Sequence, residues 1–94
     1  MSSEVYQENE YYYIATNNTF QVYTGKCILM AIVVNSTAAG AIKVIDGTSG
    51  TTANVATLKS NVSEGRYDYG VSMASGIRIV TVAASNITVI YRVN

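Results

Sequence analysis

The chain of 94 residues has no proline, no histidine and no tryptophan, and Cys27 is its single cysteine. Without histidine, acid–base catalysis would need a carboxylate or a lysine whose pKa is strongly shifted. A lone cysteine cannot form an intramolecular disulfide, and without a histidine base it is expected to be a small core hydrophobe. These residues also offer no zinc ligand set, so we expect no metal, no cofactor and no enzyme activity.

Two carboxylates are the remaining candidates for acid–base chemistry. Asp46 lies beside a predicted turn and Asp68 on the polar side of a predicted strand, so both are expected to be solvated. The segment IDGTSGTT, residues 45–52, is rich in glycine but lacks the lysine and the following helix of a phosphate-binding loop. It is predicted to be a loop between strands. No catalytic, cofactor-binding or metal-binding residue is therefore assigned.

Charge is scarce and balanced, with six basic and six acidic residues in a chain that is 49% apolar. The basic residues do not cluster, so binding to nucleic acid is not expected. The longest apolar run, residues 27–34, is far shorter than the about 20 residues that span a bilayer, so no membrane span is expected. The polar, acidic start lacks the features of a signal peptide. Low charge beside high apolar content indicates either a buried contact surface or an ordinary β domain whose Ser, Thr and Asn side chains provide the solvation.

Runs of Val, Ile, Tyr and Thr, separated by Gly, Asn, Ser and Asp, succeed one another from Tyr11 to Asn94. This rhythm is typical of all-β proteins and predicts one antiparallel β-sandwich, jelly-roll or Ig-like, of about seven to eight strands. The sandwich is expected over residues 11–94, after a flexible polar arm over residues 1–10. The predicted strands are 11–16, 20–23, 27–34, 41–46, 53–59, 66–71, 77–83 and 87–93.

The predicted strand over residues 27–34 is apolar at every position. Strict alternation would place Cys27, Leu29, Ala31 and Val33 on one face, opposite Ile28, Met30, Ile32 and Val34. A strand with two apolar faces is expected to be central and covered on both sides, by the opposing sheet and by the arm or a partner.

Tyrosine is the prominent aromatic residue, with eight copies in the chain. Consecutive strand residues alternate between faces, so Tyr11, Tyr12 and Tyr13 cannot all point the same way, and at least one is expected to be exposed or to cover a neighbour. Packing at the edges of the sandwich is the alternative use of these rings. The candidate partner-contact residues are Val5, Tyr6, Tyr11, Tyr12 and Tyr13.

The succession TGKCILMAIVVNSTAAGAIKVIDGTSGTTANVATL, followed by GIRIVTVAASNITVIY, resembles the small all-β virion proteins of tailed bacteriophages. The resemblance covers residues 24–91. It implies a head decoration (cement) protein or another small head or tail component, made in the host cytoplasm and located in the virion. The implied partners are further copies of the chain, with a trimer favoured, and the major capsid protein or another virion protein.

Two other functions fit the same residues. A carbohydrate- or receptor-binding β-sandwich module could stack exposed tyrosines on sugar rings, although such sites favour tryptophan, which this chain lacks. A monomeric domain with an intracellular role is the third possibility. Glycan binding would favour the carbohydrate- or receptor-binding module. A stable monomer without affinity for capsids would favour the monomeric intracellular domain.

Overall fold

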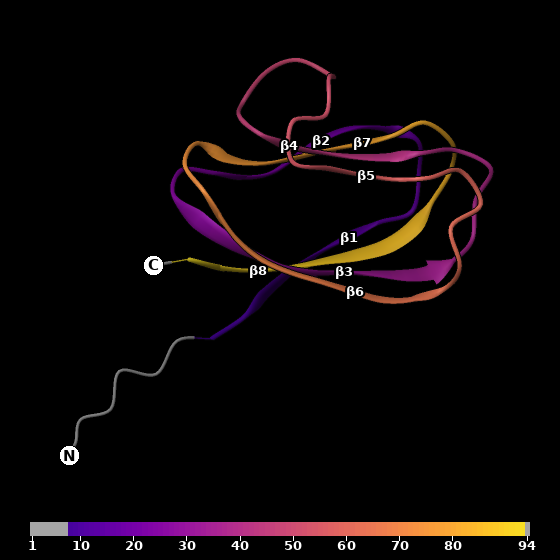
Figure 1. Ribbon diagram of the computed structural model, residues 1–94, viewed down its shortest axis with the longest axis horizontal. Coiled ribbons are helices and arrows are strands. Elements are labelled where there is room, and N and C mark those ends of the chain that lie inside the picture. The colour runs from indigo at the N-terminus through magenta and orange to yellow at the C-terminus, as the bar shows by residue number, and fades with distance from the viewer. Residues whose placement is uncertain (1–7, 94) are drawn as a thin grey trace.

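The computed structural model describes residues 8–93, which form eight strands and no helix (Figure 1). The all-β prediction is confirmed, and each predicted strand overlaps an observed one, with bounds that differ by a few residues. Accordingly, the described residues include no helix with the length and apolar character needed to cross a membrane. The strands are β1 (Glu10–Ile14), β2 (Asn18–Thr24), β3 (Cys27–Ser36), β4 (Ile42–Asp46), β5 (Ala56–Leu58), β6 (Gly65–Met73), β7 (Gly76–Thr81) and β8 (Asn86–Val93).

The strands form two antiparallel four-stranded sheets, in the orders β1-β8-β3-β6 and β2-β7-β4-β5. Figure 1 shows the two sheets as stacked layers, which confirms the predicted β-sandwich. Every connection except β4–β5 crosses from one sheet to the other. As a result, strands that are neighbours in a sheet, other than β4 and β5, are not consecutive in the sequence, and β1 and β8 lie at its two ends.

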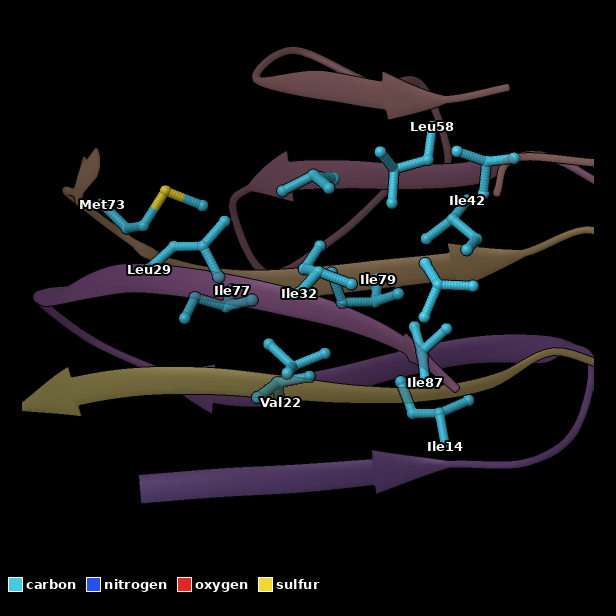
Figure 2. Close-up of a cluster of buried hydrophobic side chains, with 14 of the residues drawn as sticks. Ile14, Val22, Leu29, Ile32, Ile42, Leu58, Met73, Ile77, Ile79 and Ile87 are labelled. Atoms are coloured by element: carbon cyan, nitrogen blue, oxygen red, sulfur yellow. The ribbon is translucent and has the colours of Figure 1, made fainter. Parts of the chain in front are cut away.

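The core lies between the two sheets and receives side chains from all eight strands (Figure 2). Cys27 is 1% exposed within it, so its prediction as a core hydrophobe is confirmed. Two aromatic pairs join β2 to the opposite sheet, Tyr12 with Phe20 and Tyr23 with Tyr91. The buried core residues are Ile14, Val22, Cys27, Leu29, Ile32, Val34, Ile42, Val44, Leu58, Val62, Met73, Ile77, Ile79, Ile87 and Val89.

A β-bulge interrupts the central strand β3. Leu29 lies opposite Tyr91 and Ala31 lies opposite Ile90, so Met30 has no opposite residue on β8. The pairing of β3 with β6 shifts at the same place. A bulge of this kind adds one residue to one strand and bends the strand locally.

The bulge reverses the facing of the second half of β3. Cys27 and Leu29 point into the core, and after the bulge Ile32 and Val34 do so, while Val33 is partly exposed. The predicted central position of the strand is confirmed, since β3 lies between β8 and β6. The predicted strict alternation is wrong beyond Leu29, because one inserted residue moves all following side chains to the other face.

Ile32→Ala and Val33→Ala test this facing. Ile32 is 0% exposed, and its truncation should lower the free energy of unfolding by about 2–5 kcal/mol because it leaves a cavity in the core. Val33→Ala should cost less, about 1 kcal/mol or below, because solvent can fill the space on the outer side. Urea unfolding of both variants measures the difference. An equal or larger loss for Val33→Ala would contradict the bulge.

Candidate interaction surface

The described part of the chain contains no cluster of three or more His, Cys, Asp or Glu side chains suited to a metal. Its surface also forms no pocket. The ionisable groups named from the sequence, Asp46, Asp68 and Cys27, therefore need to be considered one by one. The contacts of each side chain show whether it is available to bind or react with a ligand or instead stabilises the fold.

Asp46 ends β4 and caps the turn between β6 and β7. Its carboxylate accepts hydrogen bonds from the backbone N–H groups of Ala74 at 2.9 Å, Ser75 at 2.8 Å and Gly76 at 3.3 Å. The bonds from Ala74 and Ser75 stabilise the charged form and lower the pKa of Asp46, although partial burial opposes them. The carboxylate of Asp46 lies near the surface, as expected, but it also caps the distant β6–β7 turn, a contact that the sequence did not predict.

The other two groups match their predictions. Asp68 is 74% exposed and forms a surface ion pair with Arg66, whose Nε lies 2.7 Å from Oδ1. Burial raises the pKa of the Cys27 thiol, and the charge of Asp46 raises it further, so the thiol stays protonated at neutral pH. Asp46, Asp68 and Cys27 thus serve the fold or face solvent.

The connection between β4 and β5, residues 47–55, is a loop. The loop prediction is confirmed for residues 47–52, whereas residues 53–55, which were predicted to begin the next strand, also belong to the loop. It is tied to the outer face of the β2-β7-β4-β5 sheet, above which it arches in Figure 1. Gln21 donates from Nε2 to the carbonyl of Gly47 at 2.9 Å, and Arg78 donates from Nε to the carbonyl of Gly50 at 2.8 Å. Arg78 also donates from Nη1 to Gln21 Oε1 at 2.9 Å. Gln21 and Arg78, on the outer face of the β2-β7-β4-β5 sheet, therefore bind the loop over residues 47–55 of the same chain.

β1 separates the three consecutive tyrosines. Tyr11 and Tyr13 point outward and are 74% and 54% exposed. Tyr12 points inward, packs against the core and lies with its ring centroid 6.3 Å from that of Phe20. The remaining candidate contact residues, Val5 and Tyr6, lie outside the described residues.

An apolar surface extends from these tyrosines across the outer face of the β1-β8-β3-β6 sheet. Its residues come from β1, β8 and β3, are partly or well exposed, and do not belong to the core cluster. We call it the outer apolar face. It consists of Tyr11, Tyr13, Ile28, Met30, Val33 and Ile90.

Polar side chains border the outer apolar face at both ends. At one end Arg92 donates from Nε to Asn9 Oδ1 at 3.1 Å, and at the other Asn35 donates from Nδ2 to Thr88 Oγ1 at 3.1 Å. From the sequence, the strand over residues 27–34 was expected to be covered by the arm or a partner on one side, but no residue of β8 was assigned to a contact site. The sequence signal that could have located this surface was the apolar residues at outward positions of β3 and β8. It could not be used because the sequence does not show that β3 and β8 are neighbours in the sheet.

No protein-family model, no curated protein and no solved structure matches this chain. The resemblance of residues 24–91 to phage virion proteins therefore stays a prediction. The outer apolar face is the feature of the described residues from which a function is argued below.

Asp46→Asn should lower the free energy of unfolding by about 1–2 kcal/mol at neutral pH, because charge-assisted hydrogen bonds to the β6–β7 turn are weakened in a partly solvated site. The matched control is Asp68→Asn, which should stay within about 0.5 kcal/mol of the wild type because it alters an exposed ion pair. Urea unfolding at neutral pH compares the two. Equal losses would contradict the capping role.

The Asp46 carboxylate should also make the free energy of unfolding depend on pH in the acidic range. The pKa of Asp46 is lower in the folded than in the unfolded protein, so its contribution is present above the ordinary value of 3.8 and is lost as the pH falls through the lowered folded value. Urea midpoints of wild type and Asp46→Asn should therefore converge below that pH. A gap that stays constant down to strongly acidic pH would assign the effect to packing instead.

Proposed function

We propose that this chain is a non-enzymatic virion structural protein of a tailed bacteriophage. Its role would be that of a head decoration (cement) protein or another small head or tail component that binds a capsid lattice through subunit contacts. The observation that carries the proposal is the outer apolar face, where exposed Tyr11 and Tyr13 continue into Ile90 and the outward residues of β3.

The composition of this surface supports contact with another protein. Interface centres are depleted in charge and enriched in tyrosine and methionine, and both types occur among its six residues, none of which is charged. Backbone rigidity adds to this, because β8 and β3 are the two central strands of their sheet. A preformed surface loses little conformational freedom on binding.

The strand order supports the jelly-roll form of the sandwich over the Ig-like form. In Ig-like domains the first two strands lie in the same sheet, whereas here β1 and β2 lie in opposite sheets and only β4–β5 stays within one. Eight-stranded jelly rolls build viral capsid domains and also lectins. A fold of this class is thus compatible with the virion role. Because the same fold also occurs in lectins, the choice between a virion protein and a sugar-binding protein has to be argued from the surface residues.

A carbohydrate- or receptor-binding module is the second candidate. It is favoured by the two outward rings of Tyr11 and Tyr13, which project from the same face of one strand and could stack on successive sugar units. A glycan array probed with the purified chain tests this function. Specific glycan binding that is lost in Tyr11→Ser would favour it over the virion role.

The virion role predicts that the chain is a component of purified particles. Tailed phage particles from cells that carry the coding sequence should contain the chain in many copies after density-gradient purification. Mass spectrometry of the particle band measures this content. Its absence from particles that hold their other structural proteins would overturn the proposal.

Tyr11→Ser/Tyr13→Ser should weaken re-binding of the purified chain to particles made without it by at least about tenfold, because buried interface tyrosines commonly contribute more than 1 kcal/mol each. Val82→Ser is the matched control, since Val82 is 54% exposed but lies outside the outer apolar face. Co-sedimentation over a concentration series gives both affinities. Equal weakening in the two variants would exclude a specific role of the tyrosines.

A further inference from the structure

Two open sheets leave four edge strands, namely β1, β6, β2 and β5. An edge strand can pair with another chain unless it is short, bulged, charged or covered. Three of the edges carry such protection. β5 has only three residues, β2 changes register between Gln21 and Tyr23, and β6 combines Arg66 and Asp68 with a shifted register and a positive φ of 64° at Gly70.

β1 carries none of these protections over most of its length. Its five residues pair with β8 in unbroken register, from Glu10 opposite Tyr91 to Ile14 opposite Ile87. It contains no proline and no lysine, and its one charge, Glu10, stands at its first position. Within residues 8–93, the side of β1 that faces away from β8 pairs with no strand. It also presents Tyr11 and Tyr13 beside this edge.

We propose that β1 pairs antiparallel with β1 of a second copy of this chain, across a two-fold axis. The two β1-β8-β3-β6 sheets then form one continuous sheet, and the outer apolar faces of both copies lie side by side. An antiparallel pair of identical strands is self-complementary, so two copies close the contact and leave no further β1 edge.

Side-chain facing selects the register of this pairing. Residues directly opposite one another lie on the same face, so outward residues must meet outward residues. With Tyr12 opposite Tyr12 of the second copy, Tyr11 meets Tyr13 twice, once on each side of the axis. Moving the centre to Tyr11 or Tyr13 leaves a single tyrosine pair, so the register centred on Tyr12 buries the most aromatic surface.

Charge is compatible with the same register. Glu10 lies opposite Ile14 of the second copy and Glu8 opposite Thr16, so no two carboxylates face each other directly. The pairing would satisfy the backbone N–H and C=O groups of the β1 edge and cover tyrosines that are now 74% and 54% exposed. This contact rests on the proposed virion role and specifies how copies of the chain associate. The sequence led us to expect a trimer, whereas the β1 edge gives a contact between two copies.

Light scattering of the full chain over a concentration series tests the contact. The wild type should reach twice the chain mass of 10.1 kDa. Tyr11→Lys/Tyr13→Lys places lysine opposite lysine in both pairs and should raise the dimer dissociation constant by at least about tenfold. Tyr11→Glu/Tyr13→Lys removes the same rings but places glutamate opposite lysine, so it should dimerise more tightly than the double lysine variant.

Val82→Lys/Ala84→Lys is the matched control, because it adds the same charge at exposed positions outside β1. It should dimerise like the wild type. A wild type that is monomeric at every concentration, or a trimer, would overturn the proposal, as would equal affinities of the two double variants at residues 11 and 13. The content of purified particles tests the virion role separately, so either proposal can fail without the other.

Discussion

The closure of two sheets around one apolar layer is the constraint on which the rest of this structure depends. Because only the β4–β5 connection stays within a sheet, every other connection carries the chain from one sheet to the other. Each strand therefore has to offer an apolar row to the opposite layer, and all eight strands do so. Function is then left to the outer faces, the loops and the strand edges.

Polar side chains stabilise the crossings between the layers. Asp46 holds the β6–β7 turn, and the buried hydroxyl of Thr81 donates to the carbonyl of Thr16 at 2.7 Å while it accepts from the backbone N–H of Asn18 at 3.0 Å. A buried polar group is tolerated when it is satisfied in this way. The side chains that suggest chemistry in the sequence, Asp46 and Cys27, are thus used by the fold itself.

The two outer faces of the sandwich differ in what covers them. Gln21 and Arg78 hold the loop over residues 47–55 against the β2-β7-β4-β5 sheet. The β1-β8-β3-β6 sheet instead leaves the outer apolar face partly exposed and ends in the regular edge of β1. This asymmetry directs both proposals to one side of the molecule, where a lattice contact and a second copy would share neighbouring surface.

Local periodicity determined much of this protein. The sandwich class and the approximate strand positions follow from a two-residue repeat between turn-forming residues, and the burial of Cys27 follows from the absence of a second cysteine and of a histidine base. Only the tertiary structure decided the bulge at Met30, the capping by Asp46 and the edge position of β1. Each of these depends on which distant strands lie side by side, and the repeat within a strand carries no information about its neighbours.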